Sequence, residues 1–157
     1  MYQTAGRRLL GVKFTTESDG AQDMANETRV RAVVERYFEF VGADVERAEE
    51  LYHADAVLEF PQTGERFVGR DTFTEWRSQH PVNFDDVRFR VVRVTARDDF
   101  AAVEPHGSQD RGATWGHGVS LLDFTGDKIS RERIYVVEDS PAPQWRARWC
   151  SEEPDLV

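Results

Sequence analysis

The sequence predicts an α+β domain in which helices come first and a run of strands comes last. Three observations predict it: an apolar stripe with helical spacing, a helical hairpin that leads into a strand, and long alternating segments after residue 87. The stripe comprises Val30, Val33, Val34, Tyr37, Phe38 and Val41, one face of a helix of period 3.6. Since that face must be buried, we expect a curved sheet to wrap around it and enclose a pocket.

The helices have recognisable ends. Asn26 or Thr28 can cap the first helix, and Gly42 can end it. Asp44 can cap a second helix, which would form a hairpin with the first. A third helix is predicted over residues 72–79, with Asp71 as its cap.

The strands follow from alternation and from turn residues. A first strand over residues 55–60 is followed by a turn at 61–64 and a return strand at 66–68. Four further strands are predicted at residues 87–97, 100–108, 115–124 and 128–138. Val91 and Val92 shift the alternation as a β-bulge would.

Length and charge narrow the class of protein. The 157 residues suit one domain, and the formal net charge of −9 disfavours nucleic acid and anionic membranes as partners. No apolar run reaches the length of a membrane span. Cys150 is the single cysteine, so an intrachain disulfide is impossible, and we expect a cytoplasmic protein. We expect residues 1–25 to be a disordered extension, residues 26–150 to be the domain and residues 151–157 to be a tail.

Seven short segments follow one another in an order and spacing that are typical of one family. They are Glu35-Arg-Tyr37, Leu51-Tyr-His-Ala-Asp-Ala56, Glu59-Phe-Pro61, Gly69-Arg-Asp71, Ala102-Val-Glu104, Gly126-Asp-Lys128-Ile129 and Arg131-Glu-Arg-Ile-Tyr135. With them, residues 27–138 resemble the SnoaL-like group of the nuclear transport factor two-like superfamily, which includes polyketide cyclases and relatives of ketosteroid isomerase. The resemblance implies a cystatin-like α+β barrel: a cone-shaped, curved mixed sheet wrapped by helices around an apolar cavity. It also implies a homodimer formed through the outer sheet face.

Two relatives can be compared residue by residue. Ketosteroid isomerase carries its base at the position that matches Phe60, a protonated carboxyl donor at Ser120 and a tyrosine donor at Tyr37. Only the tyrosine is present here. Limonene epoxide hydrolase carries an essential aspartate at the position that matches Ile134. The residues at the matching positions therefore support neither the isomerase chemistry nor the epoxide hydrolase chemistry.

The same matching places Glu104, His106 and Glu132 on the concave face. A carboxylate in an apolar cavity suits general base catalysis near neutral pH, because desolvation makes it a stronger base. Glu104 is the predicted base and Glu132 the alternative, while His106 and Tyr37 would stabilise or protonate an oxyanion. Each of these residues also has a structural alternative. The carboxylate would pair with an arginine, His106 would be a loop histidine, and Tyr37 would be a core tyrosine. His117 is expected to face outward.

The predicted ligand is a small, mostly apolar molecule. The residues expected to contact it are Tyr52, Leu58, Phe60, Phe73, Trp76, Trp115, Ser120 and Ile134. No cofactor or metal is expected, because the four histidines lack metal-ligand spacing. The predicted function is isomerisation, cyclisation or dehydration of a polyketide- or steroid-like carbonyl compound. A non-catalytic ligand carrier and a dimerisation module are the alternatives.

Overall fold

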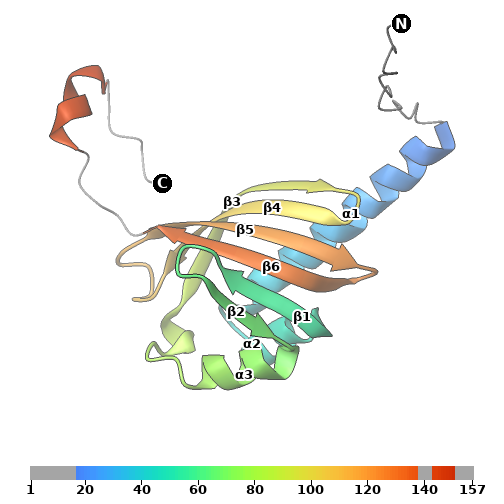
Figure 1. Ribbon diagram of the computed structural model, residues 1–157, viewed down its shortest axis with the longest axis horizontal. Helices are drawn as coiled ribbons and strands as arrows, with labels where there is room; N and C mark the ends of the chain where they lie inside the picture. Colours follow the sequence, from blue (N-terminus) through green and yellow to red (C-terminus); the bar gives the residue numbers. More distant parts are fainter. Residues whose placement is uncertain (1–16, 138–142, 151–157) are drawn as a thin grey trace, which may run out of the picture.

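The computed structural model describes residues 17–137 and 143–150. Its sheet has six strands in the order β2-β1-β6-β5-β4-β3, and helices pack on the concave face of the sheet (Figure 1). The helices are α1 (Glu17–Phe40), α2 (Val45–Glu49), α3 (Arg70–Ser78) and the short 3-10 turns η1 (Phe84–Asp86) and η2 (Gln144–Trp149). The strands are β1 (Tyr52–Phe60), β2 (Glu65–Val68), β3 (Arg88–Arg97), β4 (Phe100–Ser108), β5 (Gly116–Thr125) and β6 (Lys128–Val137).

One pair of neighbouring strands is parallel, and this pair makes the sheet a mixed one. Strand β1 lies between its hairpin partner β2, which is antiparallel, and β6, which is parallel. The strands from β3 to β6 form an antiparallel meander. The predicted bulge is confirmed, since the register shifts between Val91 and Arg93. Strand β1 begins at Tyr52, earlier than predicted, because Tyr52 already pairs with Ile129 of β6. The α+β fold class is confirmed.

Helix α1 begins at Glu17, nine residues before Asn26. The caps predicted for the start of this helix, Asn26 and Thr28, are wrong: the Thr28 hydroxyl donates to the Met24 carbonyl 2.9 Å away, a bond made within a helix. The side chains of residues 21–25 are exposed, so this part of the helix has no apolar pattern by which it could be recognised. Residues 17–25 are thus helical in this structure, where the sequence predicted a disordered extension. Residues 1–16 and the predicted tail at 151–157 lie outside the described residues.

The core lies between the helices and the concave face of the sheet. The predicted stripe of α1 is buried there, with Phe38 and Tyr37 packing edge to face at 5.1 Å. The sheet contributes alternate residues of its inner face, since successive side chains on a strand point to opposite sides. They include Leu58, Ala101, Val103, Leu122, Phe124 and Ile129. None of the helices in the described ranges is long and apolar enough to cross a membrane.

Candidate functional site

Glu132 of β6 is a carboxylate placed inside the apolar core. It is 1% exposed, and its direct neighbours across the sheet, Leu58 of β1 and Leu122 of β5, are fully buried. A buried carboxylate costs stability unless hydrogen bonds replace its water. Its partners therefore decide what it can do.

Three hydroxyl groups replace that water. Tyr37 donates to Oε2 of Glu132 at 3.3 Å, Tyr52 donates to the same oxygen, and Ser120 donates to Oε1. The hydroxyl oxygens of Tyr37 and Tyr52 are 3.0 Å apart. These four residues, here called the Glu132 cluster, come from α1, β1, β5 and β6. A chain must fold completely to assemble them.

The two tyrosines stay protonated at neutral pH. Burial raises the pKa of Tyr37 above its usual range, and the nearby negative charge of Glu132 raises it further. The same two causes, in the same order, raise the pKa of Tyr52. Both hydroxyls therefore remain hydrogen-bond donors beside the carboxylate.

A buried ion pair lies next to the Glu132 cluster. Nη1 of Arg77 on α3 is 3.1 Å from Oε1 of Glu49 on α2, and both side chains are buried. The Thr74 hydroxyl also donates to Glu49, and the Arg77 guanidinium lies 6.0 Å from the ring centre of Tyr52. Burial acts to lower the pKa of Arg77, but Tyr37, Tyr52, Glu132 and Glu49 raise it above its ordinary value. A positive charge is thus held beside the cluster.

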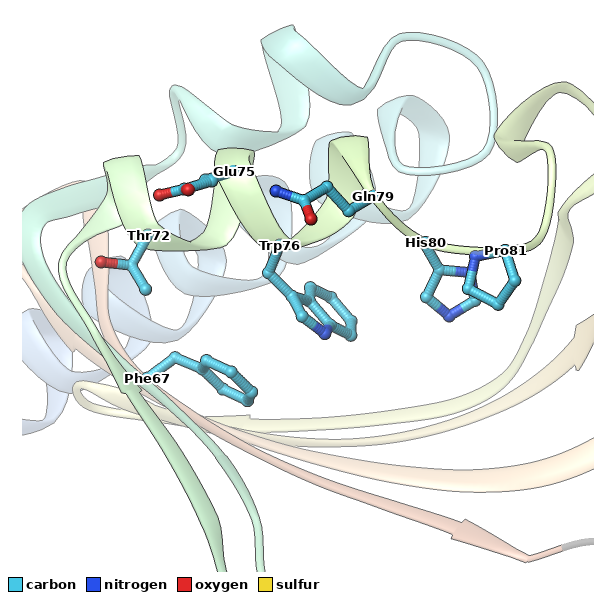
Figure 2. Close-up of a pocket in the computed structure, with 7 residues that line it drawn as sticks. All are labelled: Phe67, Thr72, Glu75, Trp76, Gln79, His80 and Pro81. Carbon is cyan, nitrogen blue, oxygen red and sulfur yellow. The ribbon is translucent and has the colours of Figure 1, made fainter.

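An aromatic pocket of about 290 Å³ opens between β2 and α3. Phe67 of β2 and Trp76 of α3 form its walls with ring centres 5.6 Å apart, and His80 follows the end of the helix. Figure 2 shows Phe67 and Trp76 lying between the helix and the strands. Thr72, Glu75 and Gln79 line the same side of α3. We refer to this hollow as the aromatic pocket.

The side chain of Leu58 separates the aromatic pocket from Glu132. Phe67, Leu58 and Glu132 form a row across β2, β1 and β6, because Leu58 pairs with both of the others. Strands in a sheet are about 4.8 Å apart, so the backbones of Phe67 and Glu132 are about 10 Å apart. The buried side chain of Leu58 lies between them.

A second hollow lies elsewhere. It measures about 480 Å³ and lies beside Gly42 and Arg88, where α1 ends and β3 begins. No residue of the Glu132 cluster lines it. The larger hollow is thus the less suitable partner for the buried carboxylate.

Glu104 and His106 do not face the concave side as predicted. Glu104 is exposed between buried Val103 and Pro105, and it belongs to the outer face of the sheet. Val103, and not Glu104, pairs with Ser120. The matching of this sequence to the family was therefore wrong by one residue on β4. A shift of one residue turns every side chain of a strand to the opposite face of the sheet.

His106 lies on the outer face with His117. The two residues pair across β4 and β5, and Nε2 of His106 is 3.2 Å from Nδ1 of His117. The outward direction predicted for His117 is confirmed. Arg90 pairs with His106 on the next strand, and its guanidinium lies 4.9 Å from the ring centre of Trp115. Trp115 therefore stands beside an outer-face residue and not beside the aromatic pocket.

The other predicted contact residues fall into two groups. Tyr52, Leu58, Phe73 and Ser120 are buried in the core around Glu132, whereas Trp76 lines the aromatic pocket. Phe60 packs on Trp76 with ring centres 5.8 Å apart, and both Phe60 and Ile134 are half-buried.

Sequence reasoning missed Phe67, His80 and the ion pair of Arg77 with Glu49. A signal existed for Arg77, because it follows Phe73 by four residues and so lies on the same face of α3. As to metals, no three His, Cys, Asp or Glu side chains in residues 17–137 and 143–150 gather closely enough to hold an ion.

Comparison with solved structures defines the class of protein. A candidate ketosteroid isomerase from Kribbella flavida DSM 17836 superposes with a TM-score of 0.73 and 25% identity, over 83% of this chain and 94% of that chain. An NTF-2 like protein of unknown function from Burkholderia xenovorans LB400 gives 0.68 and 26%, over 82% and 98%. A candidate polyketide cyclase from Sinorhizobium meliloti gives 0.55 and 20%, over 66% and 93%. The fold is therefore NTF2-like.

The sequence narrows the class to a family. The SnoaL-like domain matches residues 34–132, which is more than half of the chain, and the chain belongs to that family. No curated protein sequence matches it closely enough to count as a relative.

Proposed function

We propose that the chain is a cofactor-free enzyme that moves a proton on a small polyketide- or steroid-like carbonyl compound. The observation that carries this proposal is Glu132, a carboxylate in an apolar core that accepts from three hydroxyl groups. In this proposal Glu132 replaces Glu104 as the base. Two of the similar structures, a candidate ketosteroid isomerase and a candidate polyketide cyclase, support the substrate class.

The proposed reaction begins with enolisation. Glu132 takes a proton from the carbon next to the carbonyl group, and the C–H electrons form the C=C bond of the enolate. The carbonyl oxygen then carries the negative charge, and the hydroxyls of Tyr37 and Tyr52 are the donors that stabilise it. Return of the proton from Glu132 to another carbon gives isomerisation. Attack of the enolate on a second carbonyl, whose oxygen takes that proton, gives cyclisation, and departure of a β-hydroxyl with that proton as water gives dehydration.

The position of Ser120 supports a carboxyl group at this place in the core, although the matching group of ketosteroid isomerase is a donor and Glu132 is here the proposed base. A carboxyl donor is expected there by resemblance to ketosteroid isomerase, and the sequence has a serine instead. The carboxyl group comes from the next strand: Glu132 accepts from the Ser120 hydroxyl and also from Tyr37, the matching tyrosine. The comparison by position alone missed it.

Access to Glu132 runs through the aromatic pocket in this proposal. Phe67, Leu58 and Glu132 lie in one row, so movement of the Leu58 side chain would join the pocket to the carboxylate. Phe60 and Trp76 would hold the apolar part of the substrate at the entrance.

A second candidate function is ligand binding without catalysis. It is favoured by the burial of Glu132, which is closed to solvent behind Leu58. In that case the aromatic pocket binds a small molecule, and the Glu132 cluster only holds four elements together.

Proton exchange tests the proposal without knowledge of the natural product. The probe is 6-methoxy-1-tetralone, a two-ring ketone, incubated with the protein in D₂O while NMR follows the loss of its α-protons. The wild type should accelerate exchange, and Glu132→Gln should lower the catalysed rate by about a hundredfold or more. Glu104→Gln on the exposed outer face is the matched control and should keep the rate.

Three results would change the conclusion. Full exchange by Glu132→Gln would show that the base is misassigned. Loss of exchange in Glu104→Gln alone would restore the base predicted from the sequence. Binding of the probe without accelerated exchange would favour the carrier function.

A further inference from the structure

His80 is held rigidly at the mouth of the aromatic pocket. Its ring lies edge to face against Trp76 on one side, with centres 5.6 Å apart, and against Phe84 on the other, at 5.5 Å. Such edge contacts restrict rotation of the ring. His80 therefore presents its two nitrogens in fixed directions.

One of those nitrogens already has a partner. The backbone N–H of Val82 donates to Nδ1 of His80 at 3.2 Å. In a neutral imidazole one nitrogen accepts and the other carries the hydrogen, so this bond assigns the hydrogen to Nε2. His80 thus brings a hydrogen-bond donor to a pocket with apolar walls.

We propose that His80 determines specificity by donating Nε2–H to an oxygen acceptor at the end of the substrate far from its reacting carbonyl. This inference rests on the proposed function, which places the reacting carbonyl at Glu132. The substrate class is then a flat, two-ring ketone with a second oxygen remote from the ketone.

Three features of the aromatic pocket support that class. Phe67 and Trp76 offer ring faces and edges to a flat molecule. The volume of about 290 Å³ is at the small end for ligand pockets, which suits two rings better than four. Glu75 lines the pocket in a chain of net charge −9, and this disfavours an anionic ligand.

A pair of ligands isolates the remote oxygen. 6-Methoxy-1-tetralone and 6-ethyl-1-tetralone have the same two rings and nearly the same size, and they differ in an ether oxygen that replaces a CH₂ group. Calorimetric titration should show that the wild type binds the methoxy compound about five to ten times more tightly, the difference expected of one hydrogen bond. In His80→Phe, which keeps a ring between Trp76 and Phe84, the two compounds should bind equally.

Controls separate specificity from damage to the fold. His53→Phe makes the same substitution at a histidine outside the aromatic pocket and should keep the preference. Trp76→Leu should weaken both ligands, because it removes a wall of the aromatic pocket. Circular dichroism and the melting temperature of each variant establish that it is folded.

The proposal is overturned if the wild type binds the two ligands equally, if it binds neither, or if folded His80→Phe keeps the preference. The first two results are measured on the wild type, so they test the proposal even if His80→Phe folds poorly. Failure of the proposed function gives a different result: the ligand preference persists while Glu132→Gln exchanges α-protons at the wild-type rate.

Discussion

A carboxylate among leucines is the most costly residue choice in this core. Glu132 has Leu58 and Leu122 as its neighbours across the sheet, and it is tolerated because three hydroxyls bond to it. A leucine in its place would need none of these partners. That a carboxylate is present instead is consistent with a chemical role for this position.

The tyrosines of the Glu132 cluster should make the protein sensitive to alkali. Their pKa values are raised in the folded state, while an unfolded tyrosine ionises near pH 10. Below about pH 10 both states keep their protons and stability is unaffected. Above it the unfolded state ionises first, so the free energy of unfolding should fall by up to about 1.4 kcal/mol per pH unit for each tyrosine.

Urea denaturation at a series of pH values measures this slope. Tyr37→Phe should make it shallower, because one of the two coupled hydroxyls is gone. A wild type whose stability stays constant from pH 9.5 to 11.5 would show that the tyrosines are not held protonated by the fold.

Part of the site could be predicted from the sequence, and the reason differs by residue. Tyr37 lies on a strongly periodic stripe, so its burial follows from helical spacing. Glu104 was placed wrongly because matching to a family fixes a strand only to within a residue. The apolar alternation of Ala101, Val103 and Pro105 gives the correct face of β4 by itself. His80 is four residues from both Trp76 and Phe84, but it follows the end of α3, so helical spacing alone does not place it between the two rings.

Among the elements, α2 and α3 are joined by a buried charge pair. Glu49 and Arg77 are the centre of that contact, and each is left without its main charged partner if the other is removed. Removing one partner of a buried ion pair usually lowers the stability of the fold by more than the intact pair contributes to it. The contact therefore makes the position of α3, and of the aromatic pocket that it lines, sensitive to single substitutions.

Arg77→Met should lower the free energy of unfolding by about 3–5 kcal/mol, since Glu49 then keeps a buried charge without its partner. The double variant Glu49→Leu/Arg77→Met removes both charges and should recover most of the loss. Chemical denaturation of the two variants measures the difference. Equal stability of the single and double variants would show that the pair is not coupled. Arg97→Met, at a pair with Asp98 on the surface, should change stability by less than about 1 kcal/mol.

The elements themselves were largely predictable, and their ends were less so. Alternation located β4, β5 and β6 because each buries residues on one face, and it located β3 although Ala96 is the one buried residue of that strand. The start of α1 could not be located, because its first turns bury no apolar side chain. The neighbour of β1 was not evident from alternation, since its parallel partner β6 comes from the other end of the chain. Only the resemblance to a family, which implies a curved mixed sheet, indicated a parallel pairing of this kind.

For the whole molecule, the outer face of the sheet is the surface that we propose for dimerisation. It carries exposed apolar side chains, Val119, Tyr135 and Val137, beside ion pairs such as Arg131 with Glu59 at 2.6 Å. A two-fold axis would place the same surface on both copies, so its apolar and charged parts can meet reciprocally.

Light scattering coupled to gel filtration should therefore give twice the chain mass of 18.0 kDa at micromolar concentration. Tyr135→Glu should shift the mass toward that of one chain, because it places a charge among the apolar side chains. Met24→Glu, on the exposed first part of α1, is the control. A wild type with the mass of a single chain would contradict the proposal.

The parallel pairing of β1 with β6 also determines when the protein can fold. Tyr37 and Glu132, which meet in the core, are 95 residues apart in the sequence, and contacts between distant residues slow folding because a long loop must close first. During synthesis, β1 emerges early and waits for β6 with one edge unpaired, which is a hazard for association with other chains. The proposed base arrives on the same strand that closes this edge. A nascent chain thus lacks the proposed base, and stays open to misassembly, until β6 leaves the ribosome.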